Sequence, residues 1–471
     1  MFHKSVKSHT IKYSVIIYKN IVNKLHCGKS LGPDGLSAEH LLYCNDSIYV
    51  HISMLFSAML RYTFIPKNFM NVIMVPIIKN KCGDPCSKDN YRPISLASII
   101  SKVFERILLL RCENFLLVSD NQFAYSKNLS TELCIYTMKQ IIFSYNKCNT
   151  PIYACFIDIR KAFDRIDNDK LIMVLKSLYV PDFILNILIY WFLNQRFYLK
   201  WQSHLSNPFY STCGLRQGSV LSPILFNIYL DCLSKKLNAT KLGCYMGEYL
   251  INHFCYADDT ALIAPSFKCL QYLVNICEEF GKEYNVIFNI VKTKFMIFKP
   301  KFFKDVNPSL FFNNEKVEAV DSFCYLGVNI SKDLKDDQEM KVQIRNICAR
   351  SNSLIRKFNF CSTRIKADLF RTYCTCIYGI GLWCNFYQNT IKSMKVSYNN
   401  AFRYLLGLDR YCSISEAFLN NGVTSFQEMI RNRQFKLQRL VINSRNTLVM
   451  ASAKYAADTD LLEHWRKSLF V

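Results

Sequence analysis

Three aspartates stand where apolar, strand-like runs of the sequence end. Asp158 follows the run Ile152–Ile157 (IYACFI), and the pair Asp258-Asp259 separates HFCYA from TALIA. Carboxylates are the hard oxygen ligands that Mg²⁺ prefers, and two divalent cations about 4 Å apart drive phosphoryl and nucleotidyl transfer. Asp-Asp is also an ordinary polar turn, because Asp tolerates left-handed backbone. Carboxylates beside apolar strands are costly unless they are paired or metal-bound, which favours a two-metal site.

Only the fold can bring these aspartates together, because Asp158 and Asp258 lie 100 residues apart. The run before Asp158 predicts a buried strand, and the two runs around the Asp pair predict a β-hairpin. Helical periodicity extends over Phe267–Tyr284, and β character returns over Phe311–Ile330. After Ser331 the pattern is helical almost to the end. We therefore expect an α+β fold, with strands in the middle of the chain and helices on either side.

The N-terminal part shows the same two kinds of periodicity. Val15–Leu25 and Ser98–Phe115 have helical spacing, whereas Asn71–Ile78 is an apolar, β-branched run that ends at Lys79. Pro76 lies inside this run and lacks the N–H that a ladder hydrogen bond needs. The sequence therefore predicts an edge strand over these residues.

The composition and charge bound the class of protein. The chain has 471 residues, 51% of them hydrophobic, which predicts two to four folded domains rather than disorder. Lys and Arg total 59 against 36 Asp and Glu, a formal net charge of +23. Such a balance favours a polyanionic partner such as nucleic acid, through phosphate neutralisation and counterion release, over a generically basic surface.

The cysteines and the apolar segments indicate the compartment. The 21 cysteines show no zinc-like pairing, since Cys82 and Cys86 form a lone CxxxC without a second ligand pair. Free buried thiols in a reducing compartment are the better explanation. The apolar stretch Phe183–Leu193 is too short to span a bilayer and predicts a buried helix. Without an evident signal peptide, the sequence predicts a soluble intracellular protein that does not bind membranes.

Eight sequence blocks, in a characteristic order, cover most of the chain. Together they resemble the reverse transcriptases of non-LTR (LINE-type, jockey-like) retrotransposons, in which the same blocks follow one another. The blocks are GKSLGPDGLSAEHL (Gly28–Leu41), VIMVPIIKN with NYRPISLASIISKVFERIL (Val72–Leu108), NQFAYSKNLST (Asn121–Thr131), CFIDIRKAFDRID (Cys155–Asp167), GLRQGSVLSPILFNIYL (Gly214–Leu230), CYADDTALIA (Cys255–Ala264), FNIVKT (Phe288–Thr293) and FCYLGVNIS (Phe323–Ser331).

The resemblance implies a right-hand polymerase with four parts. These are fingers with part of the palm over residues 1–150, a palm with a ferredoxin-like antiparallel sheet over 151–330, a helical thumb over 331–405 and a helical C-terminal extension over 406–471. The implied activity is RNA-directed DNA polymerisation, which extends a DNA primer on an RNA template from dNTPs, in the nucleus or the cytoplasm. The sequence shows no endonuclease block, so a separate or missing endonuclease domain is expected.

The resemblance also assigns roles at the reacting centre. Asp158, Asp258 and Asp259 match the carboxylates that hold two Mg²⁺ ions, with Mn²⁺ as an alternative. Lys292, in Asn-x-x-Lys-Thr, matches the lysine proposed to protonate the pyrophosphate leaving group. A purely electrostatic contact between this lysine and the phosphates is the alternative.

Five further positions match residues that bind the incoming nucleotide. Phe163 lies five residues after Asp158, where a ring under the sugar excludes a 2′-hydroxyl. Lys79 and Arg92 match residues that grip the triphosphate, a task that suits cations. Gln217 and Gly218 match the lining of the nucleotide pocket, where a glycine permits close backbone approach.

Two basic helical stretches are candidates for nucleic-acid contacts. Residues 341–358 form an amphipathic segment with a cationic face, and 431–439 form a second basic stretch; both also fit a solvated helix face. One block departs from the family pattern, since Ala124-Tyr125-Ser126 replaces the usual glycine and basic residue. Two alternatives to a polymerase of a mobile element therefore stay open. One is a catalytically decayed or co-opted nucleic-acid-binding relic, and the other a group II intron-type maturase polymerase.

Overall fold

The computed structural model describes residues 15–300, 303 and 308–455, and these fall into two compact units. Each unit is built from separate stretches of chain, and each is described by itself. Unit 1 comprises Met1–Val118, Lys161–Cys232 and Phe280–Ile287, and unit 2 comprises Ser119–Arg160, Leu233–Glu279 and Phe288–Val471. The predicted division into fingers, palm, thumb and extension follows function instead of contact density, and it stays a prediction.

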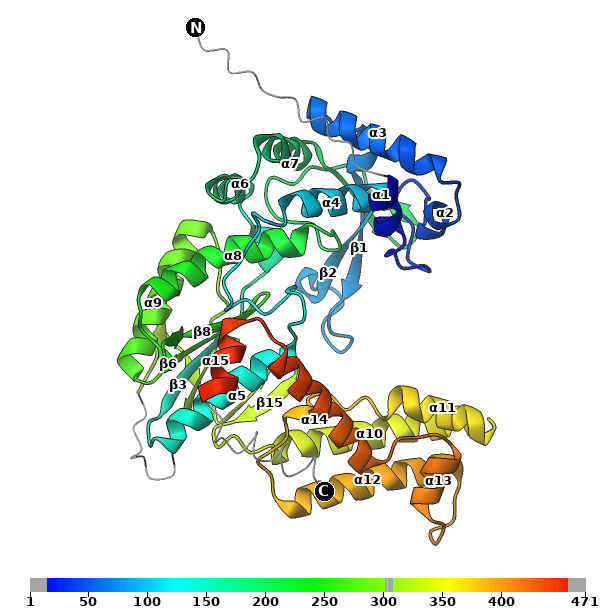
Figure 1. Ribbon diagram of the computed structural model, residues 1–471, viewed down its shortest axis with the longest axis vertical. Helices are drawn as coiled ribbons and strands as arrows, with labels where there is room; N and C mark the ends of the chain where they lie inside the picture. The colour runs from blue at the N-terminus through cyan, green and yellow to red at the C-terminus, as the bar shows by residue number, and fades with distance from the viewer. Residues whose placement is uncertain (1–14, 301–302, 304–307, 456–471) are drawn as a thin grey trace. The chain divides into compact units, whose positions relative to one another are not determined.

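Unit 1 is mainly helical, with one small sheet (Figure 1). The helices predicted at its N-terminal end, before Phe115 and across the apolar stretch are confirmed as α1, α4 and α7. Its elements are α1 (Val15–Val22), α2 (Ala38–Leu42), α3 (Ser47–Tyr62), η1 (Lys67–Met70), β1 (Asn71–Ile78), η2 (Lys88–Asn90), β2 (Tyr91–Ala97), α4 (Ile99–Cys112), η3 (Ala162–Arg165), α6 (Asn168–Ser177), α7 (Asp182–Asn194), β4 (Arg196–Trp201), β5 (His204–Leu205) and most of α8 (Ser222–Ala239).

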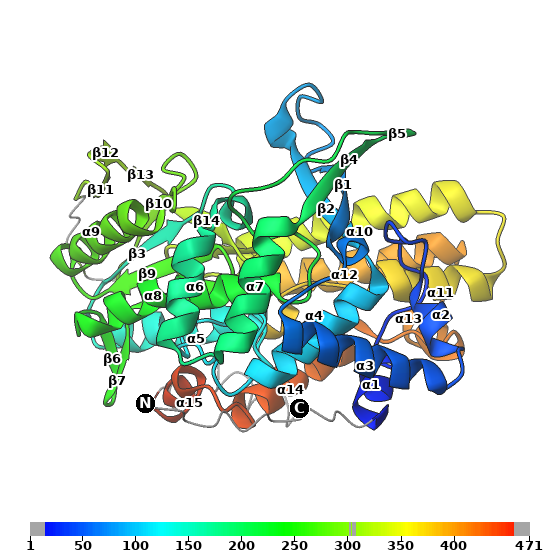
Figure 2. The same cartoon turned by 90° about the horizontal axis from the view of Figure 1, so that it is seen from above.

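The sheet of unit 1 has the order β2-β1-β4-β5, and Figure 2 shows these strands side by side. The strand over Asn71–Ile78 is confirmed, but its predicted edge position is wrong, because β1 lies between β2 and β4. The parallel pairing with β4 covers only Asn71–Met74, so Pro76 lies beyond its end. On the other side, Pro76 faces Pro93 of β2. The proline thus breaks no bond to β4, since β4 does not pair with β1 at that level.

Unit 2 contains the larger sheet and all of the C-terminal helices. The predicted helix over Phe267–Tyr284 is confirmed with the same bounds, and Phe311–Ile330 is confirmed as short strands. Its elements are α5 (Thr131–Lys147), β3 (Ile152–Ile157), β6 (Cys244–Met246), β7 (Tyr249–Ile251), β8 (His253–Tyr256), β9 (Asp259–Ala264), most of α9 (Phe267–Tyr284), β10 (Lys294–Phe298), β11 (Phe311–Phe312), β12 (Glu315–Lys316), β13 (Glu318–Ala319), β14 (Ser322–Tyr325), β15 (Val328–Ser331), α10 (Asp337–Phe358), α11 (Thr363–Tyr373), η4 (Ile380–Leu382), α12 (Gln388–Leu406), α13 (Ile414–Asn420), α14 (Phe426–Ile442) and α15 (Thr447–Tyr455).

The main sheet of unit 2 has the order β13-β10-β3-β9-β8. Strand β9 pairs antiparallel with both β3 and β8, and β3 pairs antiparallel with β10. Taken in chain order, β3, β8, β9 and β10 are the first to fourth strands, and they stand in the spatial order 4-1-3-2. This is the split β-α-β arrangement of ferredoxin-like sheets. The predicted ferredoxin-like antiparallel sheet is therefore confirmed.

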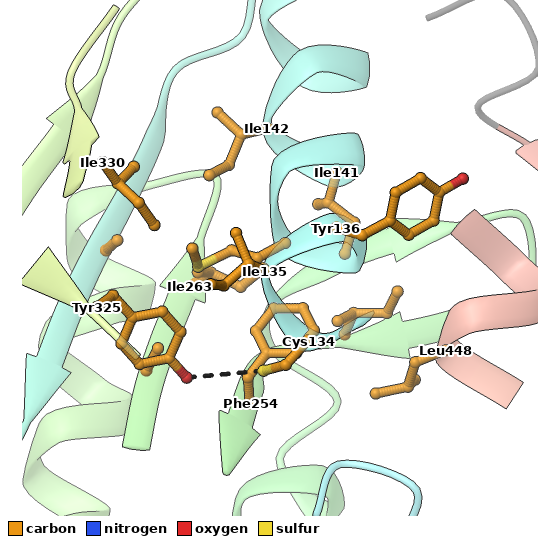
Figure 3. Packing of buried hydrophobic residues seen from close by; sticks show 14 of the residues in the cluster. Cys134, Ile135, Tyr136, Ile141, Ile142, Phe254, Ile263, Tyr325, Ile330 and Leu448 are labelled. Carbon is orange, nitrogen blue, oxygen red and sulfur yellow. Dashed lines mark hydrogen bonds between the residues drawn. The ribbon is translucent and has the colours of Figure 1, made fainter. Parts of the chain in front are cut away.

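Helix α5 is buried on all its faces over one long stretch. All ten residues from Leu133 to Ile142 are buried, whereas a surface helix would bury only one stripe. Figure 3 shows side chains of α5 directed toward Ile263 and Phe254 of the sheet, Tyr325 of β14 and Leu448 of α15. Apolar elements therefore cover α5 from several directions, which makes it the central helix of unit 2.

A buried ion pair joins α5 to the start of α10. Lys139 Nζ lies 2.6 Å from Asp336 Oδ1, and both side chains are almost fully buried. The other carboxylate oxygen of Asp336 accepts hydrogen bonds from the backbone N–H groups of Cys384 and Asn385. A buried charge pair is stable only with such complete partners, so Lys139 fixes where α10 begins.

The thiols and the membrane prediction can be compared with the structure directly. All 21 cysteines are free, as predicted, but only seven are buried. Burial of the thiols was thus overestimated, because many cysteines lie on helix faces and loops that the hydrophobic pattern does not distinguish from core positions. Among the described residues, no helix is both long enough and apolar enough to cross a membrane.

We predict that His253 makes the stability of the fold sensitive to acid. Burial lowers the pKa of His253 to about 3, and its ring contacts Asn252 and Ser234. In the unfolded chain its pKa is about 6.5, so below that pH only the unfolded state binds the proton, and the free energy of unfolding falls. Between pH 7 and pH 5 we expect His253 to cost about 2 kcal/mol.

Urea titrations of the wild type and of His253→Gln at both pH values measure this loss. The stability difference between the two proteins should shift by that amount in favour of the variant as the pH falls. His51→Gln, which changes an exposed histidine of α3, is the matched control and should shift nothing. Parallel acid sensitivity in wild type and His253→Gln would contradict the assignment.

Candidate active site

The register of the main sheet brings the predicted aspartates to one end of adjacent strands. In the antiparallel pairing of β3 with β9, Ile157 faces Thr260. The next step along each strand leads to Asp158 and Asp259, and Asp258 forms the hairpin turn before β9. All three aspartates are partly buried. Two segments 100 residues apart in sequence therefore present their carboxylates at the same end of the sheet.

The hairpin turn is held by a buried glutamine. Ala257 has a left-handed backbone with a φ of 55°, which is strained for a residue with a Cβ. The Gln122 side chain, which is almost fully buried, accepts hydrogen bonds from the N–H groups of Ala257 and Ala124, both at 3.1 Å. Sequence analysis placed Gln122 in a recognised block but gave it no role. Its position in an otherwise apolar, buried stretch was the available signal.

The carboxylates interact electrostatically with one another. Burial, and then the charges of Asp258 and Asp158, raise the pKa of Asp259 to about 6. Asp158 has two polar neighbours, since Lys292 Nζ lies 3.4 Å and Asn289 Nδ2 3.2 Å from its Oδ2 atom. The Asn289 N–H also donates to the Asp158 carbonyl. Asn289 is thus a positioning residue that sequence analysis quoted only as part of the Asn-x-x-Lys-Thr motif.

The three aspartates are the candidate ligands for divalent cations. Within the described ranges, no three His, Cys, Asp or Glu side chains stand close enough together to hold a metal ion. The chemistry nevertheless fits, because the three groups are hard oxygen donors that are close enough for their charges to raise a pKa. Divalent cations would offset this repulsion. Asp158, Asp258 and Asp259 are the residues that would hold them.

Phe163 lies in unit 1, on the short helix η3. Its ring is partly buried and stacks on Phe226 of α8, with centroids 4.6 Å apart and planes 14° from parallel. The Phe163 carbonyl accepts a hydrogen bond from Leu215 N–H at 2.7 Å. Contacts with Phe226 and Leu215 therefore fix both the ring and the backbone of Phe163.

Gln217 and Gly218 lie in the loop before α8, close to this ring. Gln217 Nε2 donates to Asp164 Oδ1 at 3.2 Å, and its carbonyl accepts from Ser95 N–H at 2.7 Å. Gly218 has a φ of +106°, and a Cβ there would lie 2.8 Å from the Ser95 carbonyl oxygen. The position therefore requires glycine, as the predicted close backbone approach implies.

Lys79 and Arg92 stand near the loop end of the β1–β2 hairpin of unit 1. Lys79 is exposed and its ammonium donates to the Asp89 carbonyl at 3.0 Å. Arg92 is exposed on β2, opposite Ile77. Lys161 pairs with the Asp89 carboxylate at 2.6 Å, which adds a third cation to this part of unit 1.

A buried glutamate that sequence analysis missed shapes the loop of Gln217. Glu105 of α4 is fully buried and pairs with Arg216. It also accepts from the Ser219 hydroxyl at 2.5 Å and from the N–H groups of Val220 and Leu221 at 2.6 and 2.9 Å. One carboxylate thus contacts four residues of the segment 216–221. Its sequence signal was a charge between apolar Phe104 and Ile107 in a helix.

The structure thus forms two groups of candidate residues. Unit 2 brings together the three aspartates and Lys292, whereas unit 1 brings together Phe163, Gln217 and Gly218, with Lys79 and Arg92 on its hairpin. Lys79 is near enough to Asp164 to act on it, because its charge opposes the rise in the Asp164 pKa that burial causes.

Comparison with known proteins gives the family. Residues 77–330, more than half of the chain, match the family described as reverse transcriptase (RNA-dependent DNA polymerase). A probable RNA-directed DNA polymerase from transposon BS of Drosophila melanogaster is 26% identical over 83% of this chain and 44% of its own length. The RNA-directed DNA polymerase from mobile element jockey of Drosophila funebris is also 26% identical, over 78% of this chain and 40% of its own.

One solved structure is also similar, and the chain spans only part of the length of its relatives. A telomerase from Candida tropicalis is 13% identical over 91% of this chain and 68% of that one, with a TM-score of 0.43. The chain spans less than half the length of these two transposon relatives. The α+β class, the ferredoxin-like sheet and the helical C-terminal region agree with the predicted fold class. On the strength of the family match and of the order of its blocks, the chain belongs to the reverse transcriptase (RNA-dependent DNA polymerase) family.

Proposed function

We propose that the chain is the RNA-directed DNA polymerase of a non-LTR retrotransposon, which extends a DNA primer on an RNA template from dNTPs. The observation that carries the proposal is the strand register that places Asp158, Asp258 and Asp259 at one end of adjacent strands. These three partly buried carboxylates are hard oxygen donors, and divalent cations would offset the repulsion between them. We further propose two Mg²⁺ ions as the cofactors, with Mn²⁺ as the alternative.

The chain's own residues then have separate tasks. When bound, the metal ions supply Lewis-acid activation of the primer hydroxyl and charge neutralisation of the triphosphate. Lys292 is two-thirds exposed, and its ammonium lies 3.4 Å from Asp158. It can protonate the departing pyrophosphate or stabilise its negative charge. Asn289 and Gln122 are positioning residues. Asn289 donates to the carboxylate and the backbone carbonyl of Asp158, and Gln122 accepts from the N–H of Ala257, next to Asp258.

The residues of unit 1 select the nucleotide in this proposal. The Phe163 ring, backed by Phe226, excludes a 2′-hydroxyl, and the loop of Gln217 and Gly218 lines the sugar and base. Lys79 and Arg92 bind the triphosphate oxygens. The 21 free thiols support residence in a reducing compartment, which we propose to be the nucleus or the cytoplasm.

We predict that Asp258→Asn abolishes nucleotide incorporation. Loss of one of three carboxylates weakens metal binding where transition-state charge develops, so the rate should fall by about 100-fold or more. The assay extends a DNA primer on an RNA template with Mg²⁺. Asp321→Asn, which changes an exposed turn aspartate paired with Lys332, is the matched control and should retain full activity.

The same assay separates the proposal from its alternatives. Primer–template binding that is retained by a wild-type chain inactive in both Mg²⁺ and Mn²⁺ would favour the nucleic-acid-binding relic. Equal loss of activity in Asp258→Asn and Asp321→Asn would point to instability rather than to a metal site.

We predict that Phe163→Val relaxes sugar selection. A smaller side chain opens the space under the sugar, so incorporation of ribonucleotides relative to deoxyribonucleotides should rise by about 10-fold or more. Steady-state kcat/KM for dNTP and NTP measures the ratio. Phe209→Val removes another partly exposed ring of unit 1, which stacks on Phe197, and should leave the ratio unchanged. An active Phe163→Val with the wild-type ratio would refute the gate.

We predict that Glu105→Gln raises the KM for dNTP by about 10-fold, with a smaller change in kcat. The neutral amide cannot accept as strongly from two N–H groups and leaves Arg216 buried without its charge partner, so the pocket loop loses its fixed geometry. Glu113→Gln, at the exposed end of the same helix, should behave as wild type. A uniform loss of thermal stability without a KM effect would assign Glu105 a purely structural role.

A further inference from the structure

Helix α14 carries a basic, solvent-facing stripe that lies outside the residues matched by the family. The match ends at residue 330, whereas α14 spans Phe426–Ile442. The helix has four cations and one carboxylate. The cations Arg431, Lys436 and Arg439 are exposed, and Lys436 and Arg439, three residues apart, are neighbours on the helix surface.

The opposite face of α14 is fixed in the interior of unit 2. Met429, Leu437 and Val441 are buried, and Leu437 and Val441 belong to the apolar core that surrounds α5. Figure 1 shows α14 near α5 in this unit. The basic stripe is therefore presented by a rigid element and not by a loop.

A groove runs along the stripe and has the size of a ligand site. Its volume is about 370 Å³, within the range of roughly 300–1,000 Å³ that is usual for small-molecule pockets. It is lined by one loop residue and five residues of α14 and its C-cap: Asn128, Phe435, Lys436, Arg439, Leu440 and Asn443.

The groove combines an aromatic ring with cations. The side chain of Phe435 is 50% exposed. The guanidinium carbon of Arg439 lies 6.0 Å from the centroid of this ring. An exposed ring beside cations is the arrangement by which proteins hold single-stranded nucleic acid, because a base stacks on the ring while the cations bind the flanking phosphates.

The cationic charge of the stripe is not neutralised within the described part of the chain. Neither Arg431, Lys436 nor Arg439 forms an ion pair with a described residue. By contrast, Lys139 and Arg216, which lie in the interior, are both paired with carboxylates. The cations of α14 are therefore available to bind the phosphates of a polyanionic partner.

One loop of the chain extends from the candidate active site to the groove. Asn128, with a left-handed φ of 63°, belongs to the loop that starts at Gln122 and passes through Tyr125. The start of this loop is hydrogen-bonded to the β8–β9 hairpin, because Gln122 accepts from Ala257 N–H at 3.1 Å and Phe123 N–H donates to the Cys255 carbonyl at 2.8 Å. Two residues, Ser126 and Lys127, separate Tyr125 from Asn128. A strand that enters the active site within unit 2 can thus follow this loop to α14.

We propose that the α14 groove binds a single-stranded segment of RNA, with a base stacked on Phe435 and phosphates on Lys436 and Arg439. The amides of Asn128 and Asn443 offer both donors and acceptors to 2′-hydroxyls and base edges, which favours RNA over DNA. The proposal rests on the proposed function in one respect, namely that the bound strand is the unpaired part of the template.

Fluorescence anisotropy of the full chain with a labelled, mixed-sequence RNA of about 16 nucleotides tests the groove. The variant Phe435→Ala/Arg439→Gln removes one ring and one cation four residues apart. The matched control is Tyr272→Ala/Lys268→Gln on α9, which removes a ring of equal exposure (52%) and an exposed cation at the same spacing. Blunt RNA–DNA duplex and single-stranded DNA of the same sequence are the comparison probes.

We expect the groove variant to bind the RNA about 10-fold more weakly, and the control variant to bind as the wild type does. Phe435→Trp should retain affinity, because it keeps a stacking surface. Arg439→Gln alone should lower the salt dependence of binding by about 0.7 in the log–log slope. Thermal unfolding of each variant establishes that it is folded.

Three results would overturn the proposal. They are equal weakening in the groove and control variants, equal weakening of blunt duplex and single strand, and an equal effect on single-stranded DNA, which would remove the choice of RNA. Because binding is measured without metal or nucleotide, an inactive polymerase would not affect these results. Extension of a DNA primer on an RNA template with a short 5′ overhang, in the presence of Mg²⁺ and dNTPs, tests the proposed function separately.

Discussion

Burial of α5 on all its faces is the constraint on which the arrangement of unit 2 depends. A helix with ten consecutive buried residues needs covering elements in every direction, and β3, β9, β14, α14 and α15 supply them. The sheet that carries the aspartates and the helix that carries the basic groove are therefore fixed to the same element. Lys139 adds a directional restraint, because removal of one member of a buried ion pair typically costs about 3–5 kcal/mol.

The loops around the candidate sites share one means of fixation. A buried polar side chain accepts hydrogen bonds from two backbone N–H groups: Gln122 from the β8–β9 hairpin and its own loop, Glu105 from the loop before α8, and Asp336 from residues 384–385. Loops without secondary structure have N–H groups that need partners when buried. An acceptor on a rigid element satisfies them and sets the loop's position at the same time. For Glu105 the elements are α4 and the loop before α8, which includes Gly218, so a buried residue of a helix sets the position of this loop.

The sequence was sufficient for the parts of the fold that periodicity dictates. The strand before Asp158, the hairpin around Asp258 and the helix α9 are found where they were predicted, since burial on one or both faces fixes their residue pattern. The edge position of β1 was predicted wrongly, because Pro76 reports only its own missing N–H and not where a neighbouring strand ends. The roles of Gln122, Glu105 and Asn289 were not predicted. Each depends on a backbone N–H or a carboxylate more than 100 residues away, and residue type alone does not reveal such a partner.

The net charge of +23 indicates a polyanionic partner but does not say where it binds, because the cations of this fold have unlike surroundings. Lys139 and Arg216 are interior partners of carboxylates, and Arg350 of α10 donates to the carbonyls of Tyr373 and Cys376. A part of the predicted cationic face of α10 is thus used to hold α11. The cations of α14 have no such internal task and stand beside an exposed ring. The distinction is physical: a cation already satisfied by the fold gains little from a phosphate, whereas an unpaired one releases counterions when it binds. A nucleic-acid interface is therefore expected at cations that the fold does not neutralise, rather than at the most basic segments of the sequence.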